Sequence, residues 1–274
     1  MPWRTRLRAV FHRERLAIWI IGLLLIGFAL FIGFAGTPYT APEETVERVA
    51  ATNSVSVSEA AGGYVLSPPG RTPETALIFY PGARVDPSAY VDVFGPVVKR
   101  TDLAVYVPKP RLNLAVFEPR LADRIIGSQP DNTSWYVGGH SLGGAMACRY
   151  AASNPETVDG VVLFGSYCDR SIADTDLAVL SVGGTRDTVL GTDRAALRPE
   201  NLPDSATIRW IEGANHTYFG SYAGQPGDSP ATITRERAHE LLRDSLVDFF
   251  EKQRQTARSP ASVQEAHLLG EQVL

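Results

Sequence analysis

Ser141 stands in a sequence context that could make it a nucleophile. The pentapeptide Gly139-His140-Ser141-Leu142-Gly143 has the form G-x-S-x-G, with an apolar, strand-like run before it and a helix-like run after it. A sharp strand-to-helix turn holds a serine hydroxyl clear of the backbone, beside a base, and flanking glycines leave room for the strained turn. The spacing therefore predicts that Ser141 is a nucleophile, with Gly139 and Gly143 as the glycines of its turn.

A serine nucleophile needs a base, and the base needs an acid that orients it. Of the five histidines, His216 follows the last predicted strand, at 208–211, and is the candidate base. Asp187 follows the strand predicted at 177–182 and is the candidate acid, with Asp169 as the alternative. This chain order, with the acid between the serine and the histidine, is the one that accompanies a G-x-S-x-G turn.

The negative oxygen that forms during acyl transfer needs two converging amide donors. The N–H of Leu142, directly after the candidate nucleophile, is the expected first donor. The second is expected in the loop after the strand at 76–80, where the Ala83 amide is the preferred candidate and the Arg84 amide the alternative.

These residues need a scaffold that gathers the ends of several strands. Short apolar runs alternate with helical patterns, which predicts a mainly parallel, doubly wound α/β sheet with helices on both faces. The predicted strands lie at 76–80, 103–107, 134–138, 161–164, 177–182 and 208–211, after an antiparallel pair at 54–58 and 63–67; helices are predicted around 90–97, at 114–126, at 145–152 and around 238–250. In such a sheet, the active residues gather at the carboxyl ends of the strands.

Three segments together resemble a known family. YPGARVDPSAY, GGHSLGGAMACRYAASNP and IEGANHTYFGSY are similar to the pattern of the alpha/beta hydrolases, in particular the compact prokaryotic group called the alpha/beta hydrolase fold-5 domain. The likeness covers roughly residues 60–250. It implies the alpha/beta hydrolase fold, a Ser-His-Asp site and no need for a metal or organic cofactor, and it leaves the substrate open.

The amino-terminal region differs in composition from the rest of the chain. Five arginines and one glutamate lie in residues 1–15, and residues 16–36 carry no charge. Twenty-one helical residues cross a hydrocarbon core of about 30 Å, and the preceding arginines predict a cytoplasmic start. We expect a basic cytoplasmic head (1–15), a transmembrane signal anchor (16–36), a tether (37–52), the hydrolase domain (53–253) and a flexible tail (254–274). The alternative is a signal peptide cleaved near Gly33-Phe34-Ala35, which would release a secreted protein.

Net charge limits the kinds of partner that the protein can have, and the cysteines allow a disulfide. The chain has 26 basic and 30 acidic residues, and beyond residue 36 the counts are 21 and 29, a net charge of −8. This balance disfavours nucleic acid as a partner. Cys148 and Cys168 lie on neighbouring predicted elements and, outside the cytoplasm, could form a disulfide; the alternative is two buried thiols. Nothing in the sequence indicates an oligomeric state.

The sequence as a whole predicts a membrane-anchored serine hydrolase that cleaves small ester or similar acyl substrates through an acyl-enzyme. The alternatives are an acyltransferase with the same residues and a non-catalytic binding module of the same fold. Only about a dozen residues separate the strand at 161–164 from the next one. That connection has no room for a helical cap, so we expect an open site and a preference for short acyl groups.

Overall fold

The computed structural model describes residues 3–129 and 133–257, with side chains from Arg15 onward. The chain divides into two compact units between Pro38 and Tyr39. The first unit consists of one helix, α1 (Trp3–Gly36). Its part from Arg15 to Gly36 is 22 residues long and apolar enough to cross a membrane, a test that a signal sequence would also pass.

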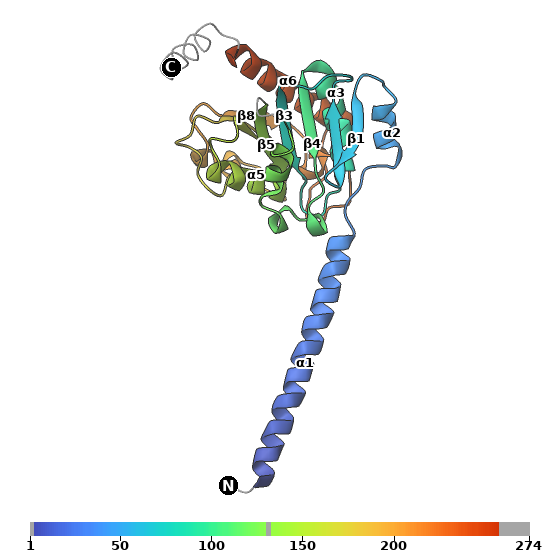
Figure 1. The fold of residues 1–274 in the computed structure, drawn as a ribbon, viewed down its shortest axis with the longest axis vertical. Helices are drawn as coiled ribbons and strands as arrows, with labels where there is room; N and C mark the ends of the chain where they lie inside the picture. Colours follow the sequence, from blue (N-terminus) through green and yellow to red (C-terminus); the bar gives the residue numbers. More distant parts are fainter. Residues whose placement is uncertain (1–2, 130–132, 258–274) are drawn as a thin grey trace. The chain divides into compact units, whose positions relative to one another are not determined.

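The second unit is built on an eight-stranded sheet in the order β1-β2-β4-β3-β5-β6-β7-β8 (Figure 1). The strands are β1 (Ser56–Ala60), β2 (Gly63–Ser67), β3 (Thr75–Tyr80), β4 (Leu103–Val107), β5 (Ser134–His140), β6 (Gly160–Phe164), β7 (Ala178–Gly184) and β8 (Thr207–Ile211). β2 pairs antiparallel with both β1 and β4, and every other neighbouring pair is parallel. The carboxyl ends of β3 to β8 therefore lie at one edge of the sheet. The mainly parallel doubly wound sheet predicted from the sequence is confirmed.

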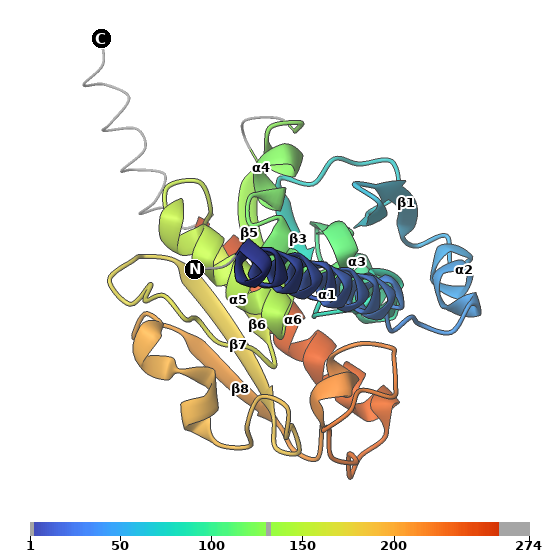
Figure 2. The same ribbon diagram turned by 90° about the horizontal axis from the view of Figure 1, so that it is seen from below.

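Helices cover both faces of this sheet (Figure 2). They are α2 (Glu44–Ala50), α3 (Ser88–Arg100), α4 (Leu121–Ile126), α5 (Leu142–Ser153) and α6 (Arg235–Ala257), with short 3-10 turns η1 (Arg111–Asn113), η2 (Ala115–Phe117), η3 (Arg194–Leu197), η4 (Pro199–Asn201) and η5 (His216–Phe219). Side chains alternate along the strands. On β3, Leu77 and Phe79 join the core beneath α3 and α6, whereas Ile78 and Tyr80 join the core beneath α4 and α5.

One predicted helix is shorter in the structure. The helix expected at 114–126 is reduced to α4, preceded by the turns η1 and η2. Pro119 explains the break, because a residue before proline is disfavoured in the helical region. Glu118 accordingly has φ −140° and ψ 63°, which lie outside the helical region.

The segment at 37–52, predicted to be a tether, is largely folded. The second unit begins at Tyr39, and α2 lies against α3 with Thr45 and Val49 buried. A Cβ on Gly95 of α3 would meet Val49 Cγ1 at 2.6 Å, so the two helices pack closely. At the other end, α6 extends through Ala257. Residues 258–274, which make up most of the predicted tail, lie outside the described residues.

Candidate active site

Ser141 occupies the turn between β5 and α5. Its φ of 54° and ψ of −125° are unusual for a residue with a side chain, and such strain is characteristic of functional turns. Two glycines make the turn possible: a Cβ on Gly139 would overlap the backbone of Gly143, and a Cβ on Gly143 would overlap the carbonyl oxygens of Tyr80 and Pro81. The glycines noted in the sequence are thus required by close backbone approach, and the Ser141 side chain is left partly exposed.

Asp187 and His216 form a buried pair at the same edge of the sheet. Asp187 follows β7, His216 opens η5 just beyond β8, and His216 Nδ1 lies 2.8 Å from Asp187 Oδ2. The other carboxylate oxygen, Oδ1, accepts hydrogen bonds from the amides of Val189 (3.0 Å) and Leu190 (2.8 Å). The carboxylate is therefore held at both oxygens, and its direction toward the imidazole is set by the backbone.

The second ring nitrogen of His216 is available for proton transfer. Nε2 is buried and has no hydrogen-bond partner within the described residues. The ring lies beside the turn that carries Ser141, because the centroids of His140 and His216 are 4.4 Å apart. With Nδ1 bound to a carboxylate, Nε2 is the atom that can accept a hydroxyl proton.

The alternative acid, Asp169, is paired elsewhere. Its carboxylate binds the guanidinium of Arg149, with Nε at 2.8 Å and Nη2 also in contact. The hydrogen bond from Arg149 lowers the pKa of Asp169. The structure therefore brings His216 together with Asp187 and not with Asp169.

In the loop at 82–86, after β3, one amide makes no hydrogen bond to any described residue. The amide of Gly82 donates to Tyr90 Oη at 2.9 Å, and that of Arg84 to the Asn113 carbonyl at 2.8 Å. The next two amides, at 85 and 86, donate to the carbonyls of residues 82 and 39. Ala83 alone in this stretch donates no hydrogen bond within the described part of the chain, and its residue is exposed. The sequence preferred the Ala83 amide over that of Arg84, and the hydrogen bonding also favours Ala83.

The Leu142 amide is the matching donor on the other side. Leu142 is the first residue of α5, where backbone N–H groups have no partner within the helix. Within the described residues its amide donates no hydrogen bond. A helix amino terminus also carries partial positive charge, which favours a developing negative charge. Among the residues that the structure describes, the amides of Ala83 and Leu142 thus both remain unpaired.

His140 connects this loop to His216. His140 is fully buried, and its Nδ1 lies 3.0 Å from Tyr90 Oη, the atom that accepts the Gly82 amide. Burial lowers the pKa of His140 well below its usual value, and the neighbouring His216 lowers it further. The imidazole beside His216 is therefore neutral near pH 7.

Comparison with known families agrees with this architecture. The model of the alpha/beta hydrolase family matches residues 76–240. The chain belongs to the alpha/beta hydrolase family. That span includes the carboxyl ends of β3 to β8 and the loops that carry Ala83, Ser141, Asp187 and His216.

Two solved structures that align with this chain are a hydrolase from an archaeon and a bacterial protein. A predicted CIB-like hydrolase from Thermoplasma acidophilum aligns with a TM-score of 0.52 and 14% identity, over 72% of this chain and 97% of its own. Est1E from Butyrivibrio proteoclasticus aligns with a TM-score of 0.48 and 11% identity, over 72% of this chain and 99% of its own. No curated protein matches the chain. The likeness to the Thermoplasma protein shows a shared fold and carries no information on substrate.

Two residues of this alpha/beta hydrolase site carried no signal in the sequence. Ser166 Oγ donates to the carbonyl of Ser141 at 2.7 Å, and Asp228 accepts from the amides of His216 (3.1 Å) and Thr217 (2.9 Å). Ser166 steadies the strained turn, and Asp228 fixes the start of η5. Both roles depend on contacts between distant segments, which no local pattern reveals.

A disulfide links the helix after Ser141 to the same region. Cys148 of α5 is bonded to Cys168, with the two Cα atoms 5.4 Å apart. Cys168 lies two residues beyond Ser166, so the bridge ties α5 to the segment that supports the turn. Of the two states left open by the sequence, the structure has the disulfide.

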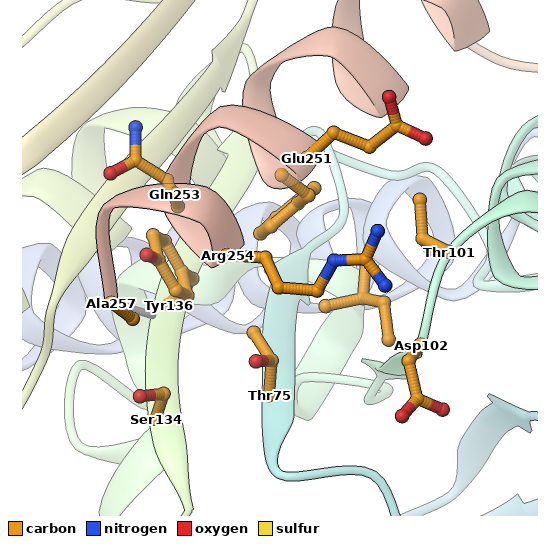
Figure 3. Close-up of a pocket in the computed structure, with 11 residues that line it drawn as sticks. Thr75, Thr101, Asp102, Ser134, Tyr136, Glu251, Gln253, Arg254 and Ala257 are labelled. Carbon is orange, nitrogen blue, oxygen red and sulfur yellow. The ribbon is translucent and has the colours of Figure 1, made fainter. Parts of the chain in front are cut away.

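The pocket in Figure 3 lies away from this site. It is lined by residues from the amino ends of strands and from the end of α6, among them Thr75, Ser134 and Arg254. Because Thr75 and Ser134 begin β3 and β5, the pocket belongs to the opposite edge of the sheet. In the described part of the chain, no group of three or more His, Cys, Asp or Glu side chains could hold a metal ion.

Proposed function

We propose that this protein is a serine hydrolase that cleaves ester or similar acyl bonds, with Ser141 as nucleophile, His216 as base and Asp187 as the orienting acid. The observation that carries the proposal is the buried Asp187–His216 pair: within the described residues His216 Nε2 has no hydrogen-bond partner, and its ring packs at a tilt against His140, the residue before Ser141. The unpaired amides of Ala83 and Leu142 support it. So does membership of the alpha/beta hydrolase family.

In the first half of the reaction, Ser141 Oγ attacks the carbonyl carbon of the substrate and transfers its proton to His216 Nε2. The negative charge on the carbonyl oxygen is stabilised by the amides of Ala83 and Leu142. Asp187 holds the imidazole in the tautomer with hydrogen on Nδ1 and stabilises the imidazolium. Collapse of the tetrahedral intermediate passes the His216 proton to the leaving group and produces an acyl-enzyme.

In the second half, water replaces the leaving group. His216 takes a proton from water, the resulting hydroxide attacks the acyl carbon, and the proton returns to Ser141 as the acid product departs. Residues 165–177, between β6 and β7, form neither helix nor strand, so this connection places no helical cap over the strand ends. The proposal therefore includes a small acyl substrate that enters an open site.

The nucleophile can be tested in the full-length protein with a fluorophosphonate probe and short nitrophenyl esters. Ser141→Ala should abolish both labelling and turnover. Ser153→Ala is the matched control, because Ser153 is an exposed serine at the far end of the same helix. Turnover by Ser141→Ala near that of the control would refute the mechanism. Partition of product to an added alcohol would instead indicate an acyltransferase.

We further propose that α1 anchors the protein in a membrane as a single span, with the catalytic domain outside the cytoplasm. Residues 15–36 supply the length and apolar composition, and the five arginines before them favour a cytoplasmic amino terminus. Protease added to intact spheroplasts should digest the domain. Protection until lysis would contradict this orientation, and a soluble form that begins near Gly36 would indicate a cleaved signal peptide.

A further inference from the structure

The residue that opens the second unit is bonded to the loop that carries Ala83. The amide of Tyr39 donates to the carbonyl of Arg84 at 2.6 Å, and the amide of Asp86 donates to the carbonyl of Tyr39 at 2.8 Å. These two bonds form a parallel bridge between Tyr39 and Val85. Tyr39 therefore pairs with the loop as one residue of an additional strand would.

The Tyr39 side chain contacts the same loop. Its ring lies 5.0 Å from the Arg84 guanidinium carbon and 5.7 Å from the ring of Tyr222. Two residues later, the amide of Ala41 donates to Ser88 Oγ at 3.4 Å, at the start of α3. The segment is thus held by its backbone, by a cation–π contact and by a contact with the helix that follows the loop.

The loop needs such support because its conformation is unfavourable in isolation. Arg84 has a φ of +58°, in the left-handed region that residues with a Cβ rarely adopt. Its amide is tied to the Asn113 carbonyl and its carbonyl to the Tyr39 amide, so two distant segments hold one residue. Because Ala83 directly precedes Arg84, the direction of the Ala83 N–H depends on this arrangement.

We propose that Tyr39 is a positioning residue of the active site, which aims the Ala83 amide at the oxygen of the reacting carbonyl by pairing with the loop at 82–86. This proposal rests on the proposed function, since it assigns Ala83 to the oxyanion hole. It makes the residue that opens the second unit part of the catalytic architecture. Substrate binding in the ground state does not require the aligned amide, so the pairing acts mainly on the transition state.

The test compares two proline substitutions in the full-length protein. Tyr39→Pro removes the amide that donates to Arg84, together with the ring, whereas Thr40→Pro puts proline at a neighbouring exposed residue whose amide makes no hydrogen bond within the described residues. Tyr39→Pro should lower kcat at least tenfold relative to Thr40→Pro, with KM changed less than twofold. Loss of a whole oxyanion donor typically lowers kcat by about 10²–10³. Affinity for phenylboronic acid, which forms a tetrahedral adduct with an active-site serine, should fall in parallel.

A fall in kcat smaller than tenfold, or an equal fall in both variants, would overturn the proposal. If Tyr39→Pro does not fold, Tyr39→Gly and Thr40→Gly replace the pair, and the threshold is a threefold fall in kcat. A general loss of structure would lower the thermal midpoint and raise KM as well, which separates it from a positioning effect.

Hydrogen exchange provides a readout that does not depend on activity. The amide of Asp86 donates to Tyr39, so its protection should fall in the Tyr39 variants and persist in the Thr40 variants. Unchanged protection would disprove the pairing itself. If Ser141→Ala stayed active and the Tyr39 variants lost protection at the Asp86 amide, the proposed function would fail and the pairing would stand. If Ser141→Ala were inactive while Tyr39→Pro kept full kcat, the positioning role alone would fail.

Discussion

The imidazole ring of His140 lies against that of His216, with centroids 4.4 Å apart and planes 40° apart. His140 Nδ1 also lies 3.0 Å from Tyr90 Oη, which accepts the Gly82 amide. Since that amide supplies its own hydrogen, the Tyr90 hydroxyl hydrogen is free to be donated to His140 Nδ1. One tyrosine thereby connects the loop of the Ala83 amide with the ring packed on the candidate base.

Tyr90→Phe should therefore lower turnover without removing any reacting group. It leaves the Gly82 amide and His140 Nδ1 without a partner in a buried site, which should cost about 1–3 kcal/mol of stability. We expect a fall in kcat of about tenfold, because the loop and the ring both lose their alignment. Tyr106→Phe is the control, since the Tyr106 hydroxyl has no hydrogen bond within the described residues. Steady-state kinetics of both variants would test this expectation. Equal kcat values for Tyr90→Phe and Tyr106→Phe would show that the Tyr90 hydroxyl does not align the site.

Replacing the acid should separate Asp187 from Asp169. Asp187→Asn keeps the shape but favours the wrong imidazole tautomer of His216, which lowers kcat by up to about 10⁴ in well-characterised triads. Asp169→Asn removes only an ion pair with the exposed Arg149 and should change kcat little. Ester turnover of the two purified variants gives the ranking. The reverse ranking would assign the acid role to Asp169.

The pKa of His140 should make stability depend on pH. Burial lowers this pKa in the folded protein, so below the usual value of about 6.5 the unfolded chain binds a proton that the folded one does not. The free energy of unfolding should then fall as pH falls below 6.5, by at most about 1.4 kcal/mol per pH unit from this group. Urea unfolding of the wild type and His140→Gln at pH 7, 6 and 5 measures the effect. The free energy of unfolding of His140→Gln should fall less steeply with decreasing pH than that of the wild type. Parallel curves would show that His140 is not the source of the pH dependence.

The disulfide should contribute substantially to stability. Its cysteines are 20 positions apart in the sequence, and closing a loop of about this length typically stabilises a protein by about 2–4 kcal/mol. The double variant Cys148→Ala/Cys168→Ala should lower the thermal midpoint by several degrees. A reductant should lower the midpoint of the wild type by a similar amount and leave the variant unchanged. If reductant, present throughout thermal unfolding, left the wild-type midpoint unchanged, the bond would not form in this protein.

Substrate preference should reflect the short connection between β6 and β7. Without a cap there, long acyl chains gain little enclosure, so we expect short-chain esters to be turned over faster and vesicles to cause no activation. Turnover of esters with two to twelve acyl carbons, with and without anionic vesicles, would test this. A preference for long chains that appears only with vesicles would instead support an esterase that acts on membrane lipids.

Much of the fold and of the candidate site was predictable because the signals are local. Strands such as β3, β5 and β6 contain short apolar runs, and the G-x-S-x-G pattern around Ser141 is contained in five consecutive residues. His216 and Asp187 were found by their place after a strand, which follows from how parallel sheets gather strand ends. The helix expected at 114–126 was wrong in its first half, because one proline outweighed the apolar pattern there.

The amino-acid sequence by itself determined the doubly wound sheet, the strained serine turn and an apolar helix long enough to span a membrane. Only the tertiary structure decided that Asp187 meets His216, that the Ala83 amide donates no hydrogen bond to any described residue, and that Tyr39 and Tyr90 both bond to the loop at 82–86. The physical reason is that these contacts are hydrogen bonds between segments far apart in the chain. Their donors and acceptors are backbone groups or single side chains, which leave no periodic or compositional trace, and packing alone brings them together.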